Sequence, residues 1–312
     1  MTMWTDHSIE TARGARIGVR VYGKRTGAPV ALYLHGGAFT GGAVATSETV
    51  PALLGEAGAV TVAAAYPLAP AHRFPDALET MFDVLGALQR CCGEWASRRS
   101  PVFVAGEEAG GNLAAALALM ARDRRAPLAG QILFSPMLDP LMGTCSLRSA
   151  EVGAVGCPWA DGWHAYLGSP DKAAHPYAAP LTATRLAGVA PALIVSAQDD
   201  PLRDESATYA RHLGKAGVPV RHHVLPAPTR WPFALEAPKS RQTCHSRDGL
   251  PMSDDMRATS PEETTHVTGP INDAIETGAP QAWAGAVVDQ LKAFFASVAA
   301  ARRLAAAPAA AL

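Results

Sequence analysis

Short apolar runs rich in β-branched residues recur along the chain and alternate with longer segments of helical periodicity. Such alternation is typical of an α/β domain, in which a mostly parallel central sheet is covered by helices on both faces. The strand-like runs are 16–23, 30–36, 59–66, 101–106, 130–136, 191–197 and 220–226, and the helical patterns are 75–98, 110–123, 205–216 and 281–303.

Three segments depart from this alternation within what we expect to be a single α/β domain over 1–312. Residues 141–190 carry aromatic side chains in a helix-like pattern between two sheet strands, which predicts a small cap. Residues 237–280 are polar, rich in Pro and Gly and without a sustained period, so we expect an inserted lid or a disordered loop. The Ala-rich residues 304–312 are expected to form a flexible tail.

The composition narrows the class of protein. Of the 312 residues 48% are hydrophobic, enough for a full core, and a net charge of -1 gives no electrostatic basis for binding nucleic acid or a membrane surface. The apolar runs are too short to span a bilayer, and the first residues lack the apolar segment of a secretory signal. Five cysteines match no zinc-binding spacing and cannot all pair, which favours reduced thiols and a cytoplasmic location. No metal or organic cofactor is implied, and a homodimer is one option for the assembly.

Two glycine-rich turns carry the candidate chemistry. In "VAGEEAGGN", Gly106 and Gly110 have the spacing of a nucleophile elbow, a sharp turn between a strand and a helix, with Glu108 at its centre. In "YLHGGAFTGG", Gly36 and Gly37 follow a strand, where backbone N–H groups can point at a substrate oxygen. A helix N-terminus favours an anion, and the Glu side chain is longer than the serine side chain that usually occupies the centre of a nucleophile elbow. We therefore expect the Glu108 carboxylate to fold toward this loop. It should stay ionised unless burial raises its pKa.

These two turns, the run "YPLAPAHRFPDAL" at 66–78 and the segment "SAQDDPLRDE" at 196–205 stand in a characteristic order. Together they resemble the hormone-sensitive-lipase family of α/β-hydrolases, which includes many bacterial esterases. The resemblance covers about 28–233 and the last helix. It implies an α/β-hydrolase fold, with oxyanion donors at Gly36, Gly37 and the backbone N–H of Ala109 and a triad acid at Asp200.

The resemblance also shows where this sequence departs from the family pattern. Glu108 stands at the serine position, and Glu107 stands at the position of the preceding aspartate. The family's catalytic histidine maps onto Trp231 in "APTRWPFAL". An indole accepts no proton, so ordinary serine-esterase turnover is not expected.

The favoured interpretation is a non-hydrolytic enzyme acting on a mostly apolar small molecule. Glu108 would act as acid or base in an elimination, cyclisation or isomerisation. Glu107 would add a second carboxylate that couples to the first, and Asp200 would orient a water or substrate or only hold its loop. Trp231 would either contact the ligand or fill the space that the family's histidine side chain occupies. The Ala, Arg and Gly content fits a GC-rich bacterial source, for which specialised metabolism is a consistent role.

Three further interpretations stay open. The chain could be a catalytically inactive binding protein, since the gibberellin receptors resemble this family and have lost the histidine. Glu108 could instead attack an alkyl carbon, as the elbow aspartate does in haloalkane dehalogenases and epoxide hydrolases. A displaced residue from 237–280, such as His245 or His266, could also rescue an atypical esterase.

Overall fold

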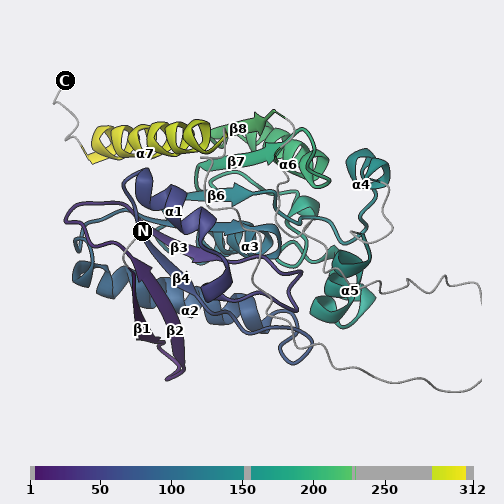
Figure 1. The fold of residues 1–312 in the computed structure, drawn as a ribbon, viewed down its shortest axis with the longest axis horizontal. Helices are drawn as coiled ribbons and strands as arrows, with labels where there is room; N and C mark the ends of the chain where they lie inside the picture. The colour runs from purple at the N-terminus through teal and green to yellow at the C-terminus, as the bar shows by residue number, and fades with distance from the viewer. Residues whose placement is uncertain (1–3, 151–155, 227–228, 230–282, 307–312) are drawn as a thin grey trace, which may run out of the picture.

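The computed structural model describes residues 4–150, 156–226, 229 and 283–306, and they form a sheet with helices on both faces (Figure 1). The eight strands lie in the order β1-β2-β4-β3-β5-β6-β7-β8. The pairs β1–β2 and β2–β4 are antiparallel and every other pair is parallel, so the predicted fold class is confirmed. The strands are β1 (Trp4–Glu10), β2 (Arg16–Tyr22), β3 (Val30–Leu34), β4 (Val60–Ala64), β5 (Val102–Glu107), β6 (Gly130–Phe134), β7 (Ala192–Ala197) and β8 (Val220–Leu225).

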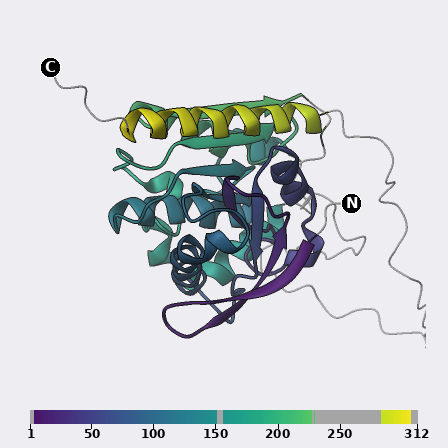
Figure 2. The same ribbon diagram turned by 90° about the vertical axis from the view of Figure 1, so that its left-hand side faces the viewer.

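The central strands are buried on both faces, and alternate residues of a strand enter different hydrophobic cores. In β5, Val102 and Val104 face one core, whereas Phe103 and Ala105 face the other. The first core includes side chains of α2 (Asp76–Cys91), α3 (Glu108–Asp123) and α6 (Arg203–Lys215). The second core includes side chains of α1 (Thr49–Glu56) and α7 (Ala284–Ala306), and Figures 1 and 2 show α7 running along the β7–β8 end of the sheet.

The apolar stripe of α7 is explained by this packing. Within the described residues, α7 is the one helix long and apolar enough to pass as a membrane span on length and composition. Its apolar side chains nevertheless join the second core, where they cover the sheet. Those buried side chains are Val287, Val288, Leu291, Phe294, Phe295 and Val298.

The predicted cap segment contains two helices in its described residues, α4 (Cys145–Ser149) and α5 (Gly156–Leu167). In α5 the side chains of Trp159, Trp163 and Tyr166 are buried and join the first core. This segment therefore packs onto the domain through its aromatic residues. Short 3-10 helices complete the elements, at Val44–Thr46, Cys92–Glu94, Pro170–Ala174 and Pro180–Thr182.

Several element boundaries differ from the sequence prediction. The strand β1 was not predicted, because only Ile9 on it is buried and its pattern is polar. The helix α1 was also missed, since Pro51 and Gly55 interrupt a short apolar pattern. The predicted tail at 304–312 begins as helix, because α7 continues to its last described residue, and the remainder lies outside the described residues. The predicted lid at 237–280 lies outside them as well.

Adjacent strands β3 and β5 position the two glycine-rich turns. Leu34 at the end of β3 pairs with Gly106 in β5, so the turns that follow both strands lie at the same edge of the sheet. The contact is close, because a Cβ at Gly110 would lie 2.1 Å from the carbonyl oxygen of Leu34. The first turn of α3 therefore needs glycine to pack against β3.

We predict that Gly110→Ala destabilises the protein by at least about 2 kcal/mol, because the added methyl group meets backbone that cannot move aside. The matched control is Gly214→Ala in the exposed part of α6, where an added Cβ meets nothing within 4 Å. That change should stabilise by about 0.5–1 kcal/mol through helix propensity. Urea unfolding of both variants checks the pair, and equal stabilities would contradict the close packing.

Candidate active site

Glu108 occupies a strained turn between β5 and α3. Its backbone φ is +54°, a left-handed conformation that glycine usually adopts, and it is the first residue of α3. A Cβ at Gly106 would lie 2.2 Å from the carbonyl oxygen of Gly110, so the turn can close only with glycine there. This is the geometry expected of a nucleophile elbow, in which the central side chain is held above the edge of the sheet.

The Glu108 carboxylate is held in the loop that follows β3. Oε2 accepts a hydrogen bond from the backbone N–H of Gly37 at 2.7 Å, and Oε1 accepts one from Ala38 at 3.1 Å. The indole Nε1 of Trp159 donates to the same Oε1 at 2.5 Å. With 3% of its surface exposed, Glu108 is enclosed by its donors. The prediction that this carboxylate folds into the loop is confirmed.

The donors to Glu108 overlap only partly with the oxyanion donors that the family resemblance implies for a substrate oxygen. Gly37 and Ala38 donate to the Glu108 carboxylate, whereas no hydrogen bond from the N–H of Gly36 or Ala109 reaches it among the described residues. The reason is the length of Glu, whose carboxylate reaches beyond the N-terminus of α3 and into the loop. Gly36 provides space, because a Cβ there would lie 2.5 Å from Oε2 of Glu108. The role of Gly36, Gly37 and Ala109 toward a substrate oxygen stays a prediction.

The pKa of Glu108 reflects a balance between burial and these donors. Burial raises the pKa to about 7, while the N–H groups of Gly37, Trp159 and Ala38 favour the ionised form. The nearby carboxylate of Glu107 raises the pKa further. Near neutral pH the side chain therefore exchanges between carboxylate and carboxylic acid. Another oxygen can accept from the loop donors only after this side chain moves away.

Glu107 lies beside Glu108 in sequence but is bound by other partners. Its Oε1 accepts hydrogen bonds from the Tyr33 hydroxyl at 2.5 Å and from Ser47 Oγ at 2.7 Å. Burial raises its pKa. Glu107 thus ties the end of β5 to β3, to the segment before α1 and, through the backbone of Gly36, to the loop that binds Glu108.

His35 supports the loop that binds Glu108. Its Nδ1 donates to the carbonyl oxygen of Gly36 at 2.7 Å, and its ring stacks on Tyr66 with 4.3 Å between centroids. The Tyr66 hydroxyl donates to the carbonyl oxygen of His35 at 2.9 Å. Burial lowers the pKa of His35, so its ring is neutral and its role is to hold the loop.

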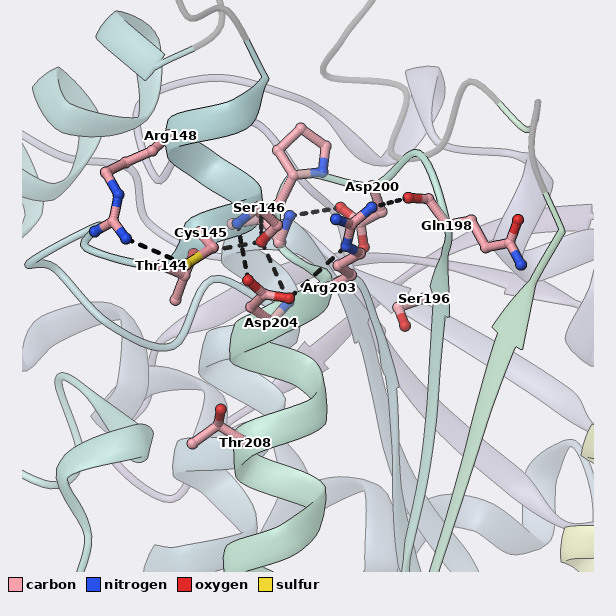
Figure 3. A network of polar contacts seen from close by, with 12 residues as sticks. Thr144, Cys145, Ser146, Arg148, Ser196, Gln198, Asp200, Arg203, Asp204 and Thr208 are labelled. Carbon is pink, nitrogen blue, oxygen red and sulfur yellow. Dashed lines mark hydrogen bonds and ion pairs between the residues drawn. The ribbon is translucent and has the colours of Figure 1, made fainter.

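Asp200 lies between β7 and α6, in a separate network of polar contacts (Figure 3). Its Oδ1 accepts a hydrogen bond from the N–H of Leu202 at 2.8 Å, and burial raises its pKa to about 7. No hydrogen bond or ion pair joins Asp200 to Glu108 in the described part of the chain. The structure therefore does not bring the two predicted catalytic carboxylates into direct contact, and Trp231 lies outside the described residues.

Acidic side chains of α6 anchor the segment that leads into the cap. The buried carboxylate of Glu205 accepts from the N–H groups of Leu138 and Asp139 at 2.6 and 3.1 Å. Asp204 accepts from the N–H of Ser146 at 2.8 Å, as Figure 3 shows. The base of the cap is thus fixed to the sheet domain. No cluster of three or more His, Cys, Asp or Glu side chains suited to a metal ion occurs among the described residues.

Two residues that donate to Glu108, Ala38 and Trp159, were not predicted as its partners. Ala38 donates because the loop turns sharply there, with φ of +121° at Gly37 and +50° at Ala38. Trp159 is separated from Glu108 by more than one element and was expected only as a cap aromatic. Its helical pattern predicted burial, but the partner of its indole N–H depends on how the cap docks.

Two relatives with named activities are similar to this chain over most of its length. An ethyl acetate hydrolase of Pseudomonas putida is 31% identical over 237 residues, which are 72% of this chain and 74% of that protein. A carboxylesterase of Mycobacterium tuberculosis is 35% identical over 217 residues, 65% of this chain and 67% of that protein.

These similarities overturn the expectation of a non-hydrolytic lyase, cyclase or isomerase. Both relatives are named for ester hydrolysis, and an arylesterase of Saccharolobus solfataricus is 30% identical over 207 residues, 64% of this chain and 68% of that protein. The expectation was wrong because it inferred the loss of hydrolysis from the residues at two positions of the sequence. The relatives point to a hydrolase instead.

Solved structures and a family model agree with the relatives. A thermostable carboxylesterase cloned from a metagenomic library superposes with a TM-score of 0.66 at 31% identity, covering 72% of this chain and 79% of that chain. The family model described as "alpha/beta hydrolase fold" matches residues 31–229, which include both glycine-rich turns and the segment that carries Asp200. This chain therefore belongs to the α/β-hydrolase fold family.

Proposed function

We propose that this chain hydrolyses small carboxylic esters and that the carboxylate of Glu108 takes the place of a serine hydroxyl at the elbow. The observation that carries the proposal is the position of that carboxylate, directly on the backbone N–H groups of Gly37 and Ala38. Similarity to proteins named as esterases supports the reaction class. On the sequence order, we further infer that Trp231 occupies the position of the histidine.

The backbone donors suit the developing charge of ester hydrolysis. When Glu108 rotates away, the N–H groups of Gly37 and Ala38 become available to the carbonyl oxygen of an ester. They would polarise the carbonyl bond and stabilise the negative charge that grows on this oxygen during attack. The rigid glycine-rich loop holds them in place before the reaction begins, which lowers the cost of reorganisation.

In this mechanism Glu108 acts as a general base toward water. Its carboxylate takes a proton from the water molecule while the water oxygen forms a bond to the carbonyl carbon. The bond from that carbon to the alkoxy oxygen then breaks, and the proton returns from Glu108 to the departing alcohol. The products are a carboxylic acid and an alcohol, and Glu108 is regenerated as a carboxylate.

A direct attack by Glu108 on the ester carbonyl fits less well. It would form a mixed anhydride, which lies higher in free energy than the ester that enters. Water activation avoids that intermediate. A pKa of about 7 also suits a general base near neutral pH, because much of the group is ionised while it still binds a proton well.

The surroundings favour a small and mostly apolar substrate. The buried side chain of Phe39, which follows Ala38 in the loop, packs on Trp163 of α5 with 4.9 Å between ring centroids. These rings leave few polar groups for substrate recognition besides the donors around Glu108. We assign Asp200 the role of holding the β7–α6 loop through Leu202.

We predict that Glu108→Gln lowers kcat/KM for p-nitrophenyl acetate by about 100-fold or more, because an amide cannot take the proton from water. Glu94→Gln, at an exposed position on the 3-10 helix Cys92–Glu94, is the matched control and should keep wild-type activity. Stopped-flow or spectrophotometric assays of the purified variants measure this. Equal rates for the wild type and Glu108→Gln would refute the proposal, as would a wild type that hydrolyses no short-chain ester.

The ionised form of Glu108 is the active form, so kcat/KM should rise with pH and level off above the pKa. The midpoint is expected at about 7, where burial places the pKa of Glu108. Below that midpoint activity should fall tenfold per pH unit. The midpoint is measured by recording kcat/KM between pH 5 and 9 for several substrates that have different leaving groups. A flat profile, or activity that falls as pH rises, would contradict the assignment.

Restoring the hydroxyl alone should not create a serine esterase. In Glu108→Ser, the indole of Trp231 cannot take the serine proton, so we expect no labelling by a fluorophosphonate probe. The double variant Glu108→Ser with Trp231→His should be labelled, because it supplies both groups. Mass spectrometry of the labelled protein distinguishes the two, and labelling of the single variant to the same extent would show that Trp231 does not occupy the base position.

A further inference from the structure

The two oxygens of Glu108 are held by donors from different parts of the chain. Oε2 accepts from Gly37, whereas Oε1 accepts from Ala38 and from the indole of Trp159. Donors that converge on one oxygen suit a single developing oxyanion, but this arrangement grips both oxygens of a carboxylate. Two of the donors belong to the loop after β3, and the third belongs to α5 in the cap.

We propose that Trp159 is a positioning residue for Glu108, which fixes the carboxylate from the cap through its indole N–H. The inference rests on the proposed function, since it assigns a task to the residue beside the reacting group. When α5 is docked, the carboxylate rests on the donors of the loop.

The environment of Trp159 explains why this hydrogen bond matters. The side chain is 2% exposed, and a buried indole N–H needs an acceptor because its desolvation is otherwise uncompensated. Glu108 is the acceptor in this structure. After Glu108 turns away, the oxygen of a bound ester is the group that can replace it, so Trp159 has a partner at both stages.

The Glu108 carboxylate has no cationic partner within the part of the chain that the structure describes. Among the described residues, no Lys, Arg or His forms an ion pair with Glu108, and the charges that act on it are the N–H dipoles and the negative charge of Glu107. The other titratable group that faces it is the buried phenol of Tyr66, whose pKa is raised well above its ordinary value by burial first and then by Glu108. Among the described residues, N–H donors alone offset the cost of burying the ionised carboxylate. The loss of one N–H should therefore shift the titration midpoint of Glu108 measurably.

The chain supplies a matched control for this test. Trp163 lies one turn further along α5 and is 3% exposed, almost the same as Trp159. Its ring packs on Phe39 and Tyr166, at centroid distances of 4.9 and 6.2 Å. Changing Trp163 to Phe removes the same atoms as changing Trp159 to Phe, so both variants lose similar packing. Only Trp159→Phe removes a donor to Glu108.

The test is a titration of Glu108 by NMR in protein labelled with ¹³C at the glutamate side-chain carboxyl, with Glu108→Gln identifying the signal. Trp159→Phe should move the midpoint of Glu108 upward by about one pH unit, because the ionised form loses a charge-assisted hydrogen bond. The pH–rate profile should move upward by the same amount. Trp163→Phe should leave both midpoints at their wild-type values.

Equal midpoints in the wild type and Trp159→Phe would overturn the proposal, as would equal shifts in the two tryptophan variants. The NMR midpoint is measured without substrate, so the positioning role can hold or fail independently of ester hydrolysis. If Trp159→Phe does not fold, the wild type labelled with ¹⁵N at indole nitrogen supplies the test. The Trp159 N–H signal should then titrate with the midpoint of Glu108, and a signal unchanged across that range would overturn the proposal.

Discussion

A buried carboxylate that is compensated only by N–H donors is the interaction on which the site depends. Glu108 is 3% exposed and has two backbone donors and one indole donor, with no ion pair among the described residues. Burial alone would favour the neutral acid, and the donors favour the anion. The resulting pKa of about 7 lets the group hold or release a proton near neutral pH.

Close backbone contacts hold Glu108 and its loop donors in position. Strands β3 and β5 are adjacent, so their turns meet at one edge of the sheet. A side chain at Gly106 or Gly110 would meet backbone atoms within 2.2 Å, and one at Gly36 would meet the carboxylate itself. The strained φ of Glu108 is maintained by this packing. The helix α5 adds one hydrogen bond to this site, from the indole of Trp159 to Oε1 of Glu108.

The sequence predicted most of the sheet and the elbow, because periodicity and glycine spacing are local signals. It also predicted that Glu108 would reach into the loop, since this follows from side-chain length and the helix N-terminus. It missed β1, whose pattern is polar, and it did not predict Ala38 as a donor to Glu108, because the turn at Ala38 depends on packing around the carboxylate. Trp159 could not be predicted as a partner, since docking of α5 is a tertiary property. The prediction that hydrolysis is lost was wrong. It relied on the side chains at positions 108 and 231 and gave too little importance to the similarity of the rest of the chain to esterases.

Hydrolysis of an ester in water enriched in ¹⁸O tests for covalent catalysis in which water releases the intermediate by attack at the Glu108 carboxyl carbon. We expect a single turnover to place the label in the carboxylic acid product and none in the enzyme, because the attacking oxygen comes from water directly. Mass spectrometry of the peptide that spans α3 reads out the Glu108 side chain. Label in that side chain would mean that Glu108 itself attacks the substrate, and an unlabelled acid would mean that water does not attack the carbonyl carbon. Either result would contradict the assignment of Glu108 as the base.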